Sequence, residues 1–173
     1  FGYVFASRGC PYACTFCESK SMWTRKVRYR SPENIVAELK QMYEFGINKV
    51  NFDDDTFGVS KKNIKALNDL IYDELPNMTY TCETVVQLAK DENVVKDMRH
   101  GGCTATFVGI ESGNNEILKE IKKTQTTDEC IQAMQNLRKH GIESHAFIMA
   151  GFPNETEETF KQTIDFISKL RPD

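Results

Sequence analysis

Short apolar runs alternate along the chain with longer segments in which apolar residues recur every three or four positions. The apolar runs have the length of buried strands, and they lie near residues 2–7, 50–52, 79–84, 104–110 and 144–150. Each run is followed by a segment with helical periodicity. Five such units in 173 residues give about 35 residues per unit, the size of a βα repeat. The pattern predicts an α/β fold built on a parallel sheet.

The helical segments carry start and stop signals. Ser31 followed by Pro32 predicts the beginning of the first long helix, and Gly46 predicts its end. Further helices are expected after Ser60, from about residue 91 to 100 and from about 127 to 140. The apolar stripes of the first two helices predict these core residues: Ile35, Val36, Leu39, Met42, Tyr43, Ile64, Leu67 and Ile71.

The last helix is expected to begin with Asn154 and Glu157 as an N-cap pair. Its apolar residues recur at helical spacing. The residues predicted to form its core face are Phe160, Ile164 and Ile167.

A run of βα units is accommodated economically by a curved or partly closed parallel barrel. We predict a partial (β/α) TIM-like barrel with about five units of an expected six, because the chain ends where another strand is due. Active-site groups of such barrels gather at the carboxyl ends of the strands. Four polar or glycine-containing stretches follow predicted strands: the cysteine loop at 10–17, and residues 53–55, 111–113 and 150–151.

Composition and charge narrow the functional classes. The 40% hydrophobic and 27% charged residues are typical of one soluble globular domain over residues 1–173. No apolar stretch approaches the roughly 20 residues that span a bilayer, which argues against a membrane role. A net charge of -3 argues against nucleic acid, and the basic run at 25–30 is interpreted as a solvated connection. With Phe1 first and no signal-peptide pattern, we expect a cytoplasmic piece of a longer protein.

Three of the six cysteines are crowded into eight residues. Cys10, Cys14 and Cys17 have CxxxCxxC spacing, one thiol short of a structural zinc site. Three thiolates on a four-iron cluster would leave one iron free to bind a small molecule. Zinc with Cys82 or Cys103 as fourth ligand, and a redox pair of Cys14 and Cys17, are alternatives. The remaining cysteines are interpreted as small buried apolar side chains: Cys82, Cys103 and Cys130.

The loop CPYACTFC at residues 10–17 resembles the signature of the radical S-adenosylmethionine (SAM) superfamily, including the aromatic residue before the third cysteine. The resemblance extends over nearly the whole chain, through FDDDTF, VGIESGNNEILKEIKK and FIMAGFPNETEETFKQTIDF. These segments resemble the branch whose members often carry a cobalamin-binding domain upstream. The resemblance implies a catalytic core with a partial barrel of the radical SAM type.

Cofactors and partners follow from this resemblance. It implies that Cys10, Cys14 and Cys17 hold a [4Fe-4S] cluster whose fourth iron binds SAM, and that reductive cleavage of SAM gives methionine and a 5'-deoxyadenosyl radical. It also implies an external electron donor of the flavodoxin or ferredoxin type and a small-molecule substrate. In this branch cobalamin would be bound by a domain outside this chain, and methyl transfer to an unreactive carbon is a common outcome.

The resemblance places SAM contacts at the strand ends. Asp53 and Asp54 are ranked ahead of Asp55, and alternation along the strand would turn Asp54 away from the other two. Without the resemblance, three acids at a strand end indicate a solvated turn. Glu111 could accept ribose hydroxyl groups and Ser112 could donate to the methionine carboxylate. The alternative for Glu111 is a capping acid for the next helix.

Other expected SAM contacts come from an aromatic ring and from backbone. Phe16 is expected near the adenine, with Met149, Ala150 and Gly151 lining the adenine site. The histidines are less informative. His100 and His140 end helices and are interpreted as solvated caps, whereas His145 lies in a strand and could face the substrate.

One segment departs from the branch. Its members commonly have an arginine and a nearby aspartate after the CET of the third strand, where this chain has Val85, Val86 and Gln87. A charge that positions SAM or substrate is therefore missing. Glu83 remains as a polar contact, with a buried or capping acid as the alternative.

Two further functions fit parts of the sequence. A methylthiotransferase acting on tRNA or a ribosomal protein would share the RGCPYACTFC and GFPNETEETF segments, but such proteins typically have glutamine where this chain has Glu111. A non-catalytic zinc module acting in protein interaction would require Cys82 or Cys103 for its metal.

Overall fold

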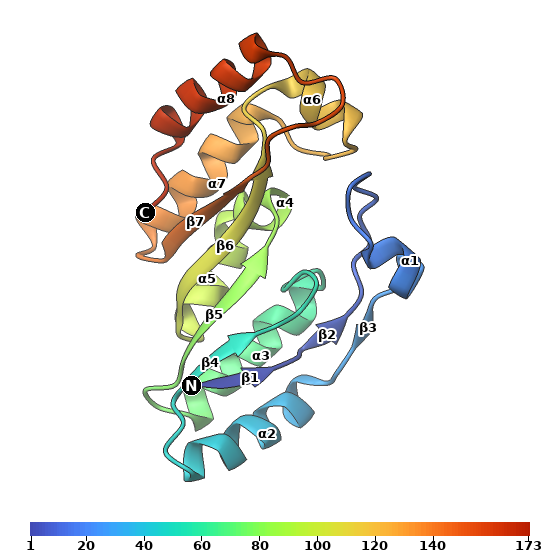
Figure 1. Ribbon diagram of the computed structural model, residues 1–173. Helices are drawn as coiled ribbons and strands as arrows, with labels where there is room; N and C mark the ends of the chain where they lie inside the picture. Colours follow the sequence, from blue (N-terminus) through green and yellow to red (C-terminus); the bar gives the residue numbers. More distant parts are fainter.

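The computed structural model describes residues 1–173 as one parallel sheet covered by helices (Figure 1). The sheet has the strand order β1-β4-β5-β6-β7, and every neighbouring pair is parallel. Its strands are β1 (Gly2–Val4), β4 (Lys49–Phe52), β5 (Thr79–Thr84), β6 (Cys103–Glu111) and β7 (Glu143–Ile148). The sheet is curved and does not close, because β1 and β7 are both edge strands. The predicted α/β fold and partial barrel are confirmed.

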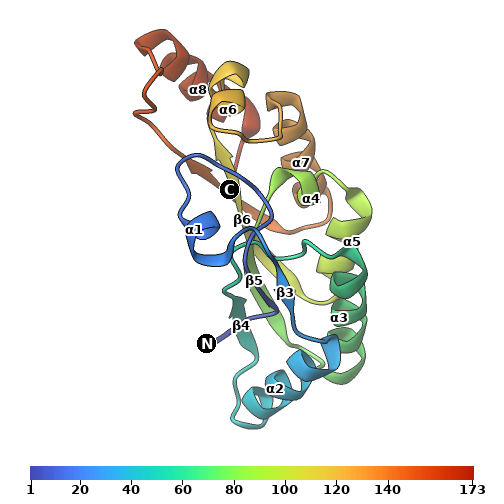
Figure 2. The ribbon, with the colours of Figure 1, turned by 90° about the vertical axis from the view of Figure 1, so that its right-hand side faces the viewer.

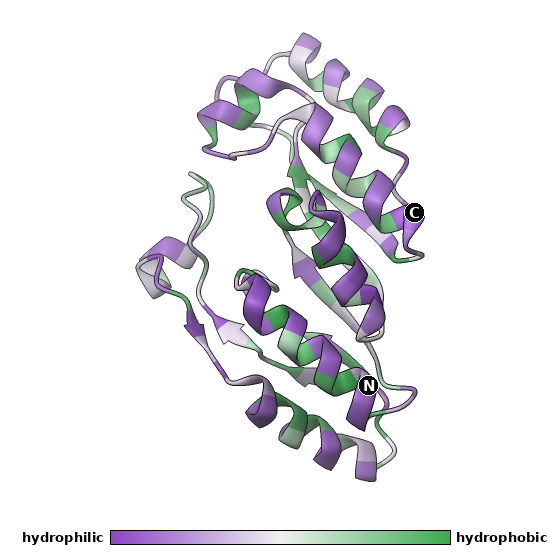
Figure 3. Ribbon diagram, turned by 180° about the vertical axis from the view of Figure 1, so that it is seen from behind, coloured by the Kyte–Doolittle hydropathy of each residue, from purple (hydrophilic) through white to green (hydrophobic).

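The long helices follow their strands and cover one face of the sheet, as the view from behind shows (Figure 3). They are α2 (Pro32–Glu44), α3 (Lys61–Glu74), α5 (Glu92–His100), α7 (Thr127–Lys139) and α8 (Glu157–Leu170). Three short helices, α1 (Ser19–Trp23), α4 (Val86–Ala89) and α6 (Asn115–Glu120), lie in connections. No helix is long and apolar enough to cross a membrane. Figure 2 shows the loop that carries α1 in front of the strands, on the side away from α3 and α5.

The hydrophobic core fills the space between the sheet and the helices. Thirty buried residues form a single cluster, which includes the predicted faces of α2 and α3. At its centre Phe52, Phe57 and Tyr80 pack ring against ring, with centroids 4.7 to 5.5 Å apart. Met42 and Tyr43 are only partly buried at its margin. The opposite, concave face of the sheet is left to the cysteine loop.

The first predicted strand, residues 2–7, is divided in two. After β1 the backbone turns, and β2 (Ser7–Arg8) pairs antiparallel with β3 (Arg28–Tyr29) in a separate sheet. The Ala6 amide donates to the Asp54 carboxylate at 2.7 Å, so it does not continue the strand. The basic run at 25–30 therefore contains a short strand that returns the cysteine loop to the sheet.

The last helix begins and packs differently from the prediction. Thr156 is its N-cap and shares a capping box with Thr159, while Asn154 donates to Glu120 at 3.1 Å. The buried side chains of α8 are Thr163, Phe166 and Leu170. Of the predicted core face, Phe160 and Ile164 are 38% and 48% exposed, and Ile167 is partly buried.

A contact with the turn after β6 explains which face of α8 is buried. Thr163 accepts from the Gly113 amide at 3.0 Å, and a Cβ at Gly113 would lie 2.5 Å from Phe166 Cβ. The small turn and the threonine together decide which side of α8 faces inward.

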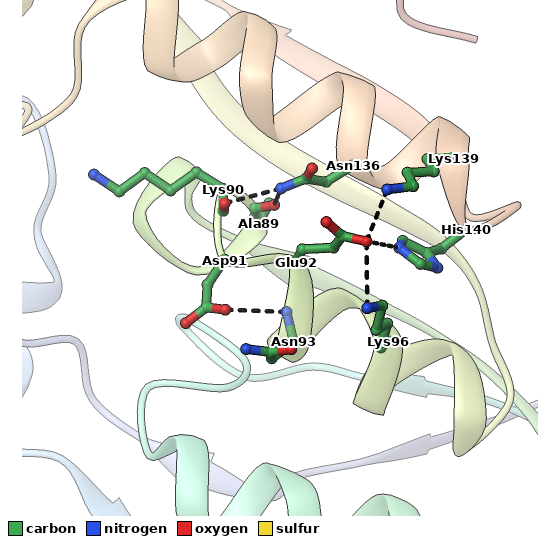
Figure 4. A network of polar contacts seen from close by, with 9 residues as sticks. All are labelled: Ala89, Lys90, Asp91, Glu92, Asn93, Lys96, Asn136, Lys139 and His140. Carbon is green, nitrogen blue, oxygen red and sulfur yellow. Dashed lines mark hydrogen bonds and ion pairs between the residues drawn. The ribbon is translucent and has the colours of Figure 1, made fainter.

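A polar network joins α5 to α7 on the outer surface (Figure 4). Glu92 accepts from Lys139 and His140, both at 3.0 Å, and hydrogen bonds to these residues lower its pKa to about 2. The His140 side chain is 18% exposed, so it is a paired side chain and not a solvated cap. His100 does end α5, and its ring stacks on Tyr72 at 4.1 Å.

Candidate active site

A cavity of about 150 Å³ lies at the carboxyl ends of the strands, on the concave face. It is enclosed by the cysteine loop, the ends of β5 to β7 and the segment after α6. Its chemically reactive or charged lining residues are Cys10, Cys14, Cys17, Asp55, Glu83, Glu111, Lys122 and Lys123. Three of the four polar strand ends predicted from the sequence thus contribute to one space.

The three thiols of the cysteine loop are unpaired and face this cavity. Cys10 and Cys14 are partly buried and Cys17 is exposed, and Cys10 Sγ lies 3.3 Å from Thr56 Oγ1. Burial raises the pKa of the Cys14 thiol, and the nearby Lys123 ammonium acts in the opposite direction. The thiols are accessible, unlike those of the core.

Asp55 fixes the shape of the cysteine loop. Its carboxylate accepts from the Gly9 amide at 2.9 Å and from the Ser19 hydroxyl at 3.0 Å, on either side of the three cysteines. Gly9 has φ of 97°, and a Cβ there would meet the Lys26 carbonyl oxygen at 2.3 Å, so only glycine fits. The Thr15 amide donates to the Ile121 carbonyl at 3.1 Å, which ties the loop to the segment after α6.

The donor set fits a cluster better than a single ion. No three His, Cys, Asp or Glu side chains converge as ligands of one metal ion. In an iron-sulfur cluster each thiolate binds a different iron, so the thiols need only line one space. Cys82 and Cys103 are fully buried on the helix-covered face and do not line the cavity. A zinc site with either as fourth ligand has no support in this arrangement.

The three acids after β4 take three different positions. Asp54 is 4% exposed and accepts from the Ala6 amide and from the Ser7 hydroxyl, at 2.7 and 2.5 Å. Burial raises its pKa to about 6. Asp53 and Asp55 are exposed, as strand alternation predicted. Asp54 lines a separate cavity of about 20 Å³, and its hydrogen bonds to Ala6 and Ser7 hold the chain before the cysteine loop. The SAM contact expected for Asp54 stays a prediction.

Glu111 is held at the cavity by a buried cation. Its side chain and that of Lys123 are 8% and 9% exposed, with Oε1 and Nζ 3.1 Å apart. Glu111 has a left-handed φ of 69°, and its carbonyl accepts from the Met149 amide at 2.9 Å. A Cβ at Gly109 would lie 2.7 Å from the Glu111 carboxylate, so this glycine leaves room for the pair. The pair, and not a helix cap, is the contact that Glu111 makes, since Asn114 caps α6.

Ser112 points away from the cavity. It is fully buried, lies 3.2 Å from the Thr163 hydroxyl and accepts from the Asn114 amide at 3.1 Å. The structure gives Ser112 a buried position between β6 and α8, and the SAM contact expected from the sequence stays a prediction.

A profile of the radical SAM superfamily matches residues 4–167, which is almost the whole chain. The chain belongs to the radical SAM superfamily. An uncharacterized methyltransferase from Pyrococcus horikoshii is 37% identical over 98% of this chain and 37% of its own length. Hopanoid C-2 methylase from Rhodopseudomonas palustris is 30% identical over 97% of this chain and 33% of its own. The radical SAM core described here therefore spans about a third of the length of these curated relatives.

Solved structures share this fold. TsrM from Kitasatospora setae, a radical SAM methyltransferase with cobalamin and a [4Fe-4S] cluster bound, superposes with a TM-score of 0.90 at 21% identity. The match covers 98% of this chain and 32% of that one. The cobalamin-dependent radical SAM enzyme OxsB gives a TM-score of 0.81 over 95% of this chain and 26% of its own. At such identities the likeness shows the fold of the radical SAM core.

The other predicted contacts lie at the rim. Phe16 lines the cavity with its ring 6.0 Å from that of Phe152. Ala150 and Gly151 are exposed and do not line the cavity, and the Gly151 amide donates to Glu155 at 2.5 Å. The radical SAM core thus brings Phe16 to the cysteines, whereas the adenine contacts of residues 150 and 151 stay predictions.

Two cavity residues, Lys123 and Gln87, were not predicted as site residues from the sequence. Lys123 supplies a cavity cation, although the sequence seemed to lack one after the third strand. Two adjacent lysines after an amphipathic helix are a common surface pattern, and only the contact to Glu111 distinguishes the second. Gln87 lines the cavity, and its buried Nε2 has no hydrogen-bond partner. Such a donor fits a cavity built to receive a polar ligand.

Proposed function

We propose that this chain is the catalytic core of an enzyme that binds a [4Fe-4S] cluster through Cys10, Cys14 and Cys17 and cleaves SAM reductively. The observation that carries the proposal is the gathering of three accessible, unpaired thiols on one short loop at the strand-end cavity. The three thiols would hold the cluster, and the chemistry it would supply is one electron to SAM, breaking a carbon-sulfur bond to give methionine and a 5'-deoxyadenosyl radical. Membership of the radical SAM superfamily supports this reading.

The chain's own residues would bind and orient SAM around this cluster. The methionine carboxylate of SAM would face Lys123, and its amino group would face the acids on the concave side, Asp53 and Glu83. Burial and the neighbouring Asp53 carboxylate raise the pKa of Glu83, so a cationic group there would be stabilised. Phe16 would pack on the adenine, and Glu111 would accept the ribose hydroxyl groups.

Asp55 would act on the loop and not on SAM. Its two hydrogen bonds hold the cysteine loop on both sides, so the sulfur positions depend on it. The fixed loop and the flanking aromatic rings would also exclude water from the radical, which is the usual contribution of the protein in cofactor enzymes.

We further propose that the complete protein is a cobalamin-associated methyltransferase. The support is that several relatives are named methylases or methyltransferases, and that they match nearly the whole of this chain. Cobalamin would be bound outside residues 1–173, in the part of the protein that the relatives possess beyond this core. A small-molecule substrate and a flavodoxin or ferredoxin type of electron donor belong to the same proposal.

Methylthio transfer is the weaker alternative. The methylthiotransferase RimO from Pseudothermotoga lettingae is 24% identical over 100% of this chain. That identity is lower than for the methylase relatives, and no feature of the cavity favours this function.

Product analysis tests the proposed cleavage. Anaerobically reconstituted protein, incubated with SAM and dithionite, should form methionine and 5'-deoxyadenosine in equal amounts. Cys17→Ala should abolish both products, because one iron loses its thiolate. Cys130→Ala is the matched control, since Cys130 is fully buried on the inner face of α7 and should be dispensable. Equal product formation by the two variants would refute the proposal.

A further inference from the structure

Three aromatic rings form a stacked row on the concave face. Phe107 of β6 stacks on His145 of β7 with centroids 4.6 Å apart, and on Phe147 with centroids 5.6 Å apart. The interplanar angle is 21° in both pairs, so the Phe107 ring is nearly parallel to each of its two neighbours. Phe107 and Phe147 line the same cavity as the cysteine thiols. We call these three residues the ring platform.

The ring platform is not part of the hydrophobic core. None of its members belongs to the buried cluster, whereas the rings of Phe52 and Phe57 on the other face are fully buried. Phe147 is 43% exposed, and the His145 side chain is 33% exposed. Flat aromatic surface left open in a cavity is well suited to stacking on a planar ligand.

Two polar features stand at the platform. Gly109 follows Phe107 on the same face of β6, and the space beside it holds the Glu111–Lys123 pair. Gln87, on the short helix after β5, lines the same cavity, and its buried Nε2 has no hydrogen-bond partner. A buried donor without a partner is costly, and an acceptor oxygen on a ligand would remove that cost.

We propose that the ring platform and Gln87 form the substrate subsite, and that it takes a planar conjugated compound bearing a carbonyl or carboxylate oxygen. The rings would stack on the conjugated system, and the Gln87 amide would donate to the oxygen. The inference deepens the proposed function and rests on it, because the subsite adjoins the thiols that would carry the cluster. It assigns specificity to this chain and not only to the parts outside it.

Binding of simple probes tests the subsite. Indole-2-carboxylate, indole and cyclohexanecarboxylate would be titrated against anaerobically reconstituted protein by saturation-transfer difference NMR, with iron content recorded for each sample. Indole-2-carboxylate should bind most tightly. Phe147→Leu should weaken it by about two- to ten-fold, because one stacking ring is lost. Phe160→Leu is the matched control, since Phe160 is a similarly exposed ring on α8, outside the cavity.

Gln87→Leu separates the two halves of the inference. This variant should weaken indole-2-carboxylate and leave indole unchanged, because only the carboxylate meets the amide. Saturable binding that is equal for the flat and the saturated carboxylate, equal effects of Phe147→Leu and Phe160→Leu, or no binding of any probe would overturn the subsite.

The two proposals fail separately. Full iron loading and SAM cleavage without platform-dependent binding would remove the subsite and leave the catalytic core. Platform-dependent binding in a protein that assembles no cluster would remove the catalytic core and leave a binding site.

Discussion

The two faces of the sheet hold the same kinds of residue in opposite states. On the helix-covered face Cys82, Cys103 and Cys130 are fully buried, and the Phe52 and Tyr80 rings are packed in the core. On the concave side Cys10, Cys14 and Cys17 are accessible, and the rings of the platform are open to the cavity. Cysteine and phenylalanine side chains are therefore core groups on one face and accessible groups on the other.

This difference shows that residue type alone does not mark the active site. A buried thiol is a small apolar group, and burial raises the pKa of Cys130 to about 12, so its reactive thiolate form is suppressed. Burial also raises the pKa of the Cys14 thiol, although Lys123 acts in the opposite direction, so the concave thiols differ from Cys130 in lining an open cavity. The cover of helices on one face and its absence on the other decide which cysteines are available to a metal.

Replacing one cysteine on each face by alanine should give the largest difference, which is a difference in iron content. Cys14→Ala should reduce iron from about four per chain to well below one, because a cluster with two protein thiolates is poorly held. Cys82→Ala should keep the iron and lower only the free energy of unfolding. Iron and sulfide assays on both variants decide the matter, and equal iron loss would contradict the division between the faces.

The aromatic rings should differ in their contribution to stability. Phe52→Ala should lower the free energy of unfolding by about 3–5 kcal/mol, because it leaves a cavity in a packed core. Phe147→Ala should cost less than about 1 kcal/mol, since its ring is already partly in solvent. Urea denaturation of both variants provides the test. Similar losses would mean that the ring platform is core.

The buried pair on the concave side should be sensitive to losing one partner. Lys123→Met should lower the free energy of unfolding by about 3 kcal/mol, because it leaves the Glu111 carboxylate buried without its cation. Glu111→Leu in the same chain should restore most of the loss. A single variant as stable as the double variant would show that the pair is solvated.

Asp54, which holds the chain before the cysteine loop, should make the free energy of unfolding depend on pH. Its folded pKa, about 6, is raised above the ordinary 3.8, so protonation favours the folded state. The stabilisation is complete below the unfolded pKa and is lost as pH rises through about 6.

Asp54→Asn fixes a neutral side chain at this position. Relative to wild type, the variant should therefore gain about 2 kcal/mol of stability between about pH 4 and about pH 7.5. Urea denaturation at the two pH values measures this change. A constant difference between the two proteins would contradict the raised pKa.

The sequence was sufficient for the main strands and the long helices, and it singled out the cysteine loop. Strands buried by helices read as apolar runs, and caps such as Ser31 and Ser60 accept the hydrogen bonds expected of them. Cys10, Cys14 and Cys17 could be found because they are adjacent in sequence, and a loop of eight residues brings them to one space.

The remaining site depended on contacts between distant residues. Ser112 is occupied by Thr163, 51 positions away, and Asp54 by Ser7, 47 positions away. The inward face of α8 depends on Gly113 in the same manner. No local sequence pattern indicates such distant partners, so the hydrogen bonds of Ser112 and Asp54 could not be predicted from the sequence.

The central claim is most directly tested by electron paramagnetic resonance of the reduced, anaerobically reconstituted protein, with and without SAM, together with iron and sulfide per chain. We predict about four irons and four sulfides per chain and a spectrum that changes when SAM is added, because three thiolates leave one iron open. Stoichiometric zinc, or a cluster signal indifferent to SAM, would contradict the account.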